Sequence, residues 1–152
     1  MHPFRFAATM PAPTAPLAEW HAQLRHLEDL GLSSVVAADH FTGGYTFEPM
    51  VALTAAAAAT SRLRLQTGVL GNDYRHPVLV HRMAALLDVV SDGRLVLGLG
   101  AGWMTSDYEA AGIALDPPGV RVSRFAEALK IIHPLLRRGR VDLDGAYYLA
   151  RD

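Results

Sequence analysis

The stretch Arg94-Leu-Val-Leu-Gly-Leu-Gly-Ala-Gly-Trp103 places an apolar run directly before a loop in which every second residue is glycine. Short apolar runs bounded by turn residues are typical of buried strands. Gly98, Gly100 and Gly102 carry no Cβ, so a flat ligand can approach the main chain closely. The stretch therefore predicts a cofactor site at the carboxyl end of a strand.

Strand-like and helix-like segments alternate on both sides of this stretch. Strands are expected at 4–8, 34–38, 62–70 and 95–99. Helices are expected from Thr14-Ala-Pro16, from Pro49, from Pro77 and over about 123–136, since proline is tolerated in a first helical turn. The alternation around Asp144-Gly145 predicts a small hairpin over 141–149. Four successive βα units predict an α/β fold with a parallel sheet covered by helices.

Composition excludes several classes of protein. The chain has 152 residues, a formal charge of −1 and no cysteine, which excludes disulfides, thiol catalysis and zinc–thiolate sites. Because lysine and arginine are not in excess over aspartate and glutamate, the composition gives no indication of nucleic-acid binding. No apolar run approaches the roughly 18 residues of a membrane span, and no signal peptide is apparent. We expect one cytoplasmic domain over 1–152.

A dinucleotide-binding Rossmann site is the first alternative for the glycine loop. Its G-x-G-x-x-G fingerprint follows the first strand. Here the loop follows the fourth strand, and Trp103 stands where the third glycine belongs. This disfavours the Rossmann interpretation, while a tight turn without a ligand stays open.

Asp39-His40 directly follows the second expected strand. A carboxylate and an imidazole at the carboxyl end of a strand are well placed for ligand contact and proton transfer. Histidine titrates near neutral pH, so His40 is the candidate catalytic residue. A histidine that merely makes a structural hydrogen bond is the alternative.

Further candidates follow the third strand. Gly68 permits a bulge facing a ligand, Asn72 offers an amide contact, and Arg75-His76-Pro77 either binds phosphate or caps a helix. His76 and His81 are five residues apart, the wrong spacing for one helical face, so no metal site is expected. The pairs Glu28/Asp29 and Asp107/Glu109 are interpreted as solvated helix charges.

The order of these motifs carries more information than any one of them. Trp20 is followed by Leu30-Gly-Leu, Val36-Ala-Ala-Asp-His-Phe41, Thr60-Ser-Arg-Leu-Arg-Leu-Gln-Thr-Gly-Val69, Arg75-His-Pro77, Leu87-Asp-Val-Val-Ser-Asp-Gly-Arg94, the glycine loop and Asp116-Pro-Pro-Gly119. The set closely resembles the luciferase-like monooxygenase superfamily over essentially all 152 residues. It looks most like the branch that uses the deazaflavin coenzyme F420.

The resemblance implies a (β/α)8 barrel of TIM type with its site at the carboxyl ends of the strands. It implies that Asp39 contacts the deazaflavin ring, that Gly68-Val69 is a non-prolyl cis peptide beneath the ring, and that backbone at Gly100, Ala101 and Gly102 lines it. Asn72 and Trp103 complete the expected cofactor-binding set. In the sugar-phosphate dehydrogenase branch a glutamate stands at the position of Trp103, which argues against that reaction here.

The implied activity is hydride transfer between coenzyme F420 and a small organic substrate, with His40 moving the accompanying proton. FMN is the alternative cofactor, and with oxygen the reaction would be a monooxygenation. A full barrel needs at least roughly 200 residues, so four βα units and a hairpin predict a half-barrel. We expect it to form a homodimer or to pair with a complementary half-barrel chain; a binding or assembly module without turnover is the alternative of another class.

Overall fold

The computed structural model describes residues 4–13 and 16–152. Its main sheet contains the strands β1 (Ala7–Thr9), β2 (Ser34–Ala37), β3 (Arg64–Thr67) and β5 (Leu95–Val96), all parallel and in the order β1-β2-β3-β5. Within this sheet, each of the four strands pairs with the one that follows it among the four, as in a (β/α) barrel. A dinucleotide-binding sheet would instead reverse its strand order beside the first strand. The expected parallel α/β fold is confirmed, although β1 begins later than expected.

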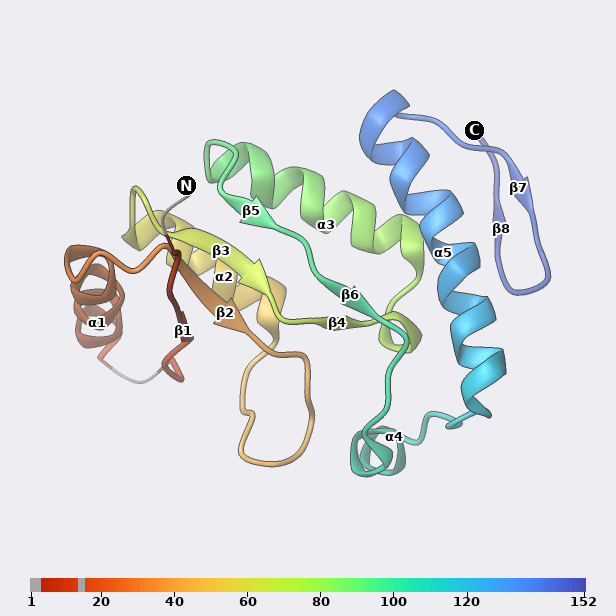
Figure 1. Ribbon diagram of the computed structural model, residues 1–152, viewed down its shortest axis with the longest axis horizontal. Helices are drawn as coiled ribbons and strands as arrows, with labels where there is room; N and C mark the ends of the chain where they lie inside the picture. Colours follow the sequence, from red (N-terminus) through yellow and green to blue (C-terminus); the bar gives the residue numbers. More distant parts are fainter. Residues whose placement is uncertain (1–3, 14–15) are drawn as a thin grey trace.

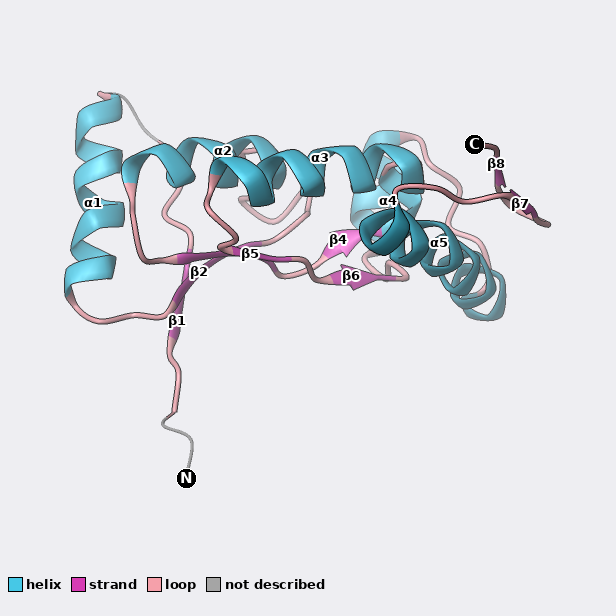
Figure 2. Ribbon diagram, turned by 90° about the horizontal axis from the view of Figure 1, so that it is seen from above, coloured by secondary structure: helices cyan, strands magenta, loops and turns pink. Residues whose placement is uncertain are grey.

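Three helices lie along one side of this sheet (Figures 1 and 2). They are α1 (Leu17–Asp29), α2 (Pro49–Ala59) and α3 (Pro77–Val90), and the last two begin at the expected prolines. Thr14, expected near the start of the first helix, lies outside the described residues. The core between helices and sheet is almost fully buried and includes Leu24, Val35, Leu53, Ala56, Leu65 and Leu87. The alanine run of α2 lets this helix approach the sheet closely.

The third and fourth strands, expected over 62–70 and 95–99, are both interrupted, and the break in the third begins at Gly68, where a bulge was expected. After β3 the chain passes through a cis peptide at Gly68-Val69, and a second parallel pair then forms between β4 (Leu70–Gly71) and β6 (Leu99–Gly100). The Thr67 hydroxyl bridges the break, because it donates to the Gly98 carbonyl at 2.8 Å and accepts from the Gly98 N–H at 2.7 Å. A buried side chain thus replaces the missing main-chain hydrogen bonds.

The C-terminal third wraps beside α3 (Figure 1). A short 3-10 turn, η1 (Asn72–Tyr74), follows β4; α4 (Thr105–Ala111) follows β6; α5 spans Pro118–Arg138. Helix α4 was not predicted, and α5 begins five residues earlier than expected because Pro118 suits a first helical turn. The expected hairpin is confirmed as β7 (Leu143–Asp144) and β8 (Leu149–Ala150).

Glu28 on α1 is not the solvated charge that the sequence suggested. Its carboxylate is buried and accepts hydrogen bonds from the backbone N–H groups of Ser61, Arg62 and Leu63, where α2 leads into β3. The neighbouring Asp29 is exposed, as expected. Glu28 therefore fixes the approach of the chain to the third strand. None of the helices within the described ranges 4–13 and 16–152 is long and apolar enough to cross a membrane.

Candidate active site

A pocket of about 210 Å³ lies at the carboxyl ends of the strands, and we call it the ring pocket. It brings together every site residue predicted from the sequence except Asn72: Asp39, His40, Gly68, Val69, Gly100, Ala101, Gly102 and Trp103. These residues come from three different strand–loop junctions. They converge because the carboxyl ends of parallel strands meet at one edge of a sheet.

The alternating glycines have a packing role that the sequence did not reveal. A Cβ on Gly98 would collide with the carbonyl oxygen of Thr67, and one on Gly100 would lie 2.8 Å from Cγ2 of Val69. At Gly102 the backbone adopts a φ of +77°, and a Cβ there would collide with the hydroxyl of Tyr108. The space left by the missing side chains is therefore filled by protein. The main chain of Gly100 and Gly102 nevertheless still lines the ring pocket.

The peptide between Gly68 and Val69 is cis, as the family resemblance implied. Gly68 is required at this position, because a Cβ there would collide with Cγ1 of Val36 on the adjacent strand. The Val69 side chain is about half exposed at the ring pocket and contacts the glycine loop. Val69 thus offers an apolar surface to a flat ligand.

Asp39 is buried at the pocket with both carboxylate oxygens already engaged. Oδ2 accepts from the Gly71 N–H at 2.8 Å, and Arg75 makes a two-pronged ion pair with the carboxylate at 2.5 and 2.9 Å. Arg75 also donates to Glu48 at 2.7 Å. Such bidentate pairs fix geometry as well as charge. Arg75 is therefore an internal partner of Asp39, and His76 caps α3 by accepting from the Val78 N–H.

His40 is held by a carboxylate that the sequence analysis missed. Its Nδ1 lies 2.6 Å from Oδ2 of Asp107, at the first turn of α4. The side chain of Asp107 is fully buried, whereas that of His40 is 20% exposed and lines the ring pocket. The other Asp107 oxygen accepts from the N–H groups of Phe41 and Thr42 and from the Thr42 hydroxyl. The interpretation of Asp107 as a solvated charge is wrong.

The environment of Asp107 determines which nitrogen of His40 carries a proton. Burial opposes ionisation of Asp107, but the hydrogen bonds from His40, Thr42 and Phe41 outweigh it and lower the pKa of the carboxyl. An ionised carboxylate can only accept, so the Nδ1–H of His40 donates to it. Nε2 is then the ring nitrogen available to accept a proton. This is the tautomer that a general base requires.

Aromatic rings surround His40 at the mouth of the site. The centroid of the Tyr45 ring lies 4.9 Å from that of the His40 imidazole, and the centroid of the Trp103 ring lies 6.0 Å from it. Trp103 is 70% exposed. Tyr74 lines the ring pocket beside them, and burial together with the charges of Asp107 and Asp39 raises its pKa to about 12. Tyr74 therefore stays protonated at neutral pH.

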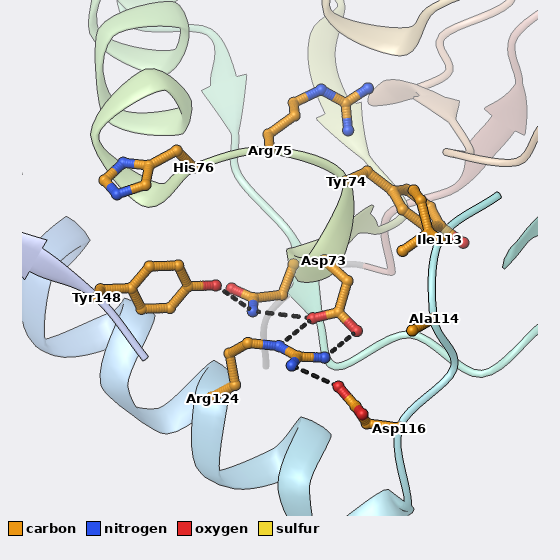
Figure 3. Close-up of a pocket in the computed structure, with 10 residues that line it drawn as sticks. Asp73, Tyr74, Arg75, His76, Ile113, Ala114, Asp116, Arg124 and Tyr148 are labelled. Carbon is orange, nitrogen blue, oxygen red and sulfur yellow. Dashed lines mark hydrogen bonds and ion pairs between the residues drawn. The ribbon is translucent and has the colours of Figure 1, made fainter. Parts of the chain in front are cut away.

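Asn72 lines a neighbouring pocket of about 420 Å³ instead of the ring pocket. Its amide donates to the Tyr148 hydroxyl at 3.0 Å. Figure 3 shows this second pocket, where Arg124 of α5 lies between Asp73 and Asp116 and pairs with both, at 2.8 and 2.7 Å. This network ties η1 to α5 and the hairpin.

Three carboxylates combine buried side chains with lowered pKa values, and they determine how the stability of the fold depends on acid pH. Hydrogen bonds overcome the effect of burial at Glu28, Asp73 and Asp107 and hold each pKa below its ordinary 4.5 or 3.8. Each contributes stability above its ordinary, unfolded-state pKa, and this contribution is lost as the pH falls through the lower folded-state pKa. Each pKa unit by which folding lowers a carboxyl corresponds to about 1.4 kcal/mol in the free energy of unfolding.

We therefore expect the free energy of unfolding to be level between pH 7 and 5 and to fall steeply between pH 4.5 and 3. Urea denaturation followed by tryptophan fluorescence at each pH measures it. Glu28→Gln should make the profile shallower, whereas Asp29→Asn, at the exposed neighbour, should leave its shape unchanged. A level profile down to pH 3 would contradict the assignment.

Comparison with known proteins agrees with this geometry. A family model described as luciferase-like monooxygenase matches residues 1–152. A 4-hydroxyprotoasukamycin monooxygenase of Streptomyces nodosus subsp. asukaensis is 38% identical over 122 residues, which cover 79% of this chain and 30% of that protein. An F420-dependent glucose-6-phosphate dehydrogenase of Beutenbergia cavernae is 37% identical over 131 residues, which cover 82% of this chain and 39% of that protein.

Among solved structures, the coenzyme F420-dependent tetrahydromethanopterin reductase of Methanopyrus kandleri superposes with a TM-score of 0.80 and 25% identity. The match covers 96% of this chain and 44% of the reductase. The chain thus spans less than half the length of the relatives it matches. The matched family model, the shared fold and the site at the strand ends lead to one conclusion: the chain belongs to the luciferase-like monooxygenase family.

Proposed function

We propose that this chain forms part of an oxidoreductase that transfers hydride between coenzyme F420 and a small organic substrate. The observation that carries the proposal is the His40–Asp107 pair, which presents a proton-accepting nitrogen beside a pocket with a flat apolar wall. The F420-dependent relatives support the choice of cofactor. Bound F420 would supply the hydride chemistry itself, as cofactors do for steps that side chains cannot perform.

The residues of the ring pocket fit a planar heterocycle. Val69 supplies an apolar face, and the backbone of Gly100, Ala101 and Gly102 supplies a wall without long side chains. The pocket volume of about 210 Å³ is below the roughly 300–1,000 Å³ typical of complete small-molecule sites. The pocket therefore suits the ring of the cofactor, while the remainder of the molecule would extend beyond it.

His40 would move the proton that accompanies hydride transfer. With Nδ1–H held by Asp107, Nε2 can take a proton from a substrate hydroxyl, and the resulting imidazolium is stabilised by the carboxylate. Arg75 and the Gly71 N–H hold Asp39 in place at the same edge. The protein thereby orients the reacting groups and supplies one proton acceptor.

Titration of the purified chain with F420 and with FMN, followed by the fluorescence of each cofactor, tests the proposal. We expect saturable binding of F420, and light scattering of the same samples reports whether the expected homodimer forms. Binding of FMN alone would favour the monooxygenase alternative. A chain that changes the fluorescence of neither cofactor would contradict the proposed function and favour a module without turnover.

His40→Ala separates proton transfer from cofactor binding. Loss of a general acid–base group costs roughly 10²–10⁴-fold in turnover, and we expect a loss in this range with little change in the F420 dissociation constant. His76→Ala, at the α3 cap, serves as the matched control and should retain turnover. Equal loss of turnover and of affinity in His40→Ala would show that His40 holds the cofactor instead.

A further inference from the structure

A third pocket, of about 320 Å³, shares Asp39 and His40 with the ring pocket and is lined largely by the loop between β2 and α2. We call it the loop pocket. Its other lining residues include Phe41, Tyr45, Phe47, Glu48 and Arg75. His40 thus stands between the two pockets, and a molecule in the loop pocket would lie beside the same imidazole as a ring in the ring pocket.

The loop pocket presents aromatic surface. Phe41 is 43% exposed and Tyr45 37% exposed, while Phe47 packs against the hydrophobic core behind them. Aromatic rings exposed in a concave site provide large contact area and stack on other flat groups. Tyr45 also contacts the His40 ring, so a ligand against Tyr45 would be close to the proton acceptor.

The charges of the loop pocket disfavour an anionic ligand. Among its described lining residues Arg75 is the only arginine or lysine, and it is engaged by both Asp39 and Glu48. Burial opposes the charge on Arg75, but these two carboxylates raise its pKa, so the guanidinium is charged and paired with both of them. One arginine against two carboxylates leaves the wall with a net negative charge, which repels phosphate.

We propose that the loop pocket binds the substrate, and that the substrate is an uncharged aromatic alcohol or carbonyl compound, not a phosphorylated sugar. This rests on the proposed function for its role in turnover, but binding in the loop pocket is measurable without cofactor. The aromatic side chains hold the ring of the substrate, and its oxygen lies within reach of His40.

NMR titration of the chain with benzyl alcohol, inorganic phosphate and glucose 6-phosphate tests this inference. We expect benzyl alcohol to shift the ring signals of Phe41 and Tyr45 in a saturable manner, in the millimolar range, and the two phosphates to leave them unchanged. Tyr45→Ala should weaken binding of benzyl alcohol at least fivefold. Tyr147→Ala, at a similarly exposed aromatic on the hairpin, should leave it unchanged.

Two further variants locate the site. Trp103→Ala, in the ring pocket, should leave benzyl alcohol binding intact, and a loss there with none in Tyr45→Ala would overturn the proposal. Glu48→Gln removes one of the two carboxylates that pair with Arg75 and should increase phosphate binding. Tighter binding of glucose 6-phosphate than of benzyl alcohol to the unaltered chain, or no shift with benzyl alcohol, would also overturn it. Failure of F420 to bind while benzyl alcohol binds would contradict the proposed function alone.

Discussion

Replacing Asp107 by asparagine is expected to lower turnover about as far as losing the histidine itself, roughly 10²–10⁴-fold, while the fold remains intact. The asparagine oxygen can still accept from Phe41 and Thr42, as Oδ1 of Asp107 does. The asparagine NH₂ then replaces Oδ2 and must donate to Nδ1 of His40. His40 is thereby locked with its proton on Nε2, and it can no longer accept one there.

The tautomer change has a readout independent of turnover. In ¹⁵N NMR spectra, the His40 ring should carry its proton on Nδ1 in the unaltered chain and on Nε2 in Asp107→Asn, with His40→Gln identifying the signals. Asp107→Ala is expected to destabilise the fold instead. It leaves buried N–H groups without an acceptor, and each such group costs about 1–3 kcal/mol of stability. Glu109→Gln, exposed on the same helix, is the control. An unchanged tautomer in Asp107→Asn would refute the positioning role.

The fold was largely predictable because its signals are local. Prolines mark the starts of α2 and α3, and apolar runs mark the parallel strands. The order of the strands followed from their alternation with helices. What could not be predicted is the break in the fourth strand and its bridge to the third, because Thr67 and Gly98 are 31 positions apart. No local pattern reports such a pairing.

The residues that line the site were predicted from the sequence, but the residues that hold His40 and Asp39 in place were not. His40 and the glycine loop were identified because they directly follow strands, whose carboxyl ends share one edge. Asp107 was missed because a seven-residue helix is too short for a clear apolar period, and a carboxylate on a helix is usually solvated. A signal for Asp107 was nevertheless available. Asp107 follows the fourth strand, and residues that follow parallel strands lie at the same edge of the sheet. Arg75 was expected either to bind phosphate or to help cap a helix, yet it pairs with Asp39.

The glycine loop predicts the second large effect, on stability. Gly98→Ala places a Cβ against the Thr67 carbonyl oxygen and 3.0 Å from Cγ1 of Val69. The contact with Thr67 involves backbone, so no side-chain rotation relieves it, and the two interrupted strands must move apart. Overpacking of this kind costs about 1–3 kcal/mol and occasionally more. We expect a loss at the upper end of that range, because the Thr67–Gly98 bridge would break as well.

Gly119→Ala is the matched control, since it makes the same chemical change in the first turn of α5. No heavy atom lies within 4 Å of the added methyl group there, and alanine favours a helix over glycine by roughly 0.5–1 kcal/mol. The two substitutions should therefore change the free energy of unfolding in opposite directions in urea at pH 7. Gly98→Ala should also weaken F420 binding, because Val69 moves with the strand break. A Gly98→Ala protein as stable as the unaltered chain would show that the loop does not depend on this close approach.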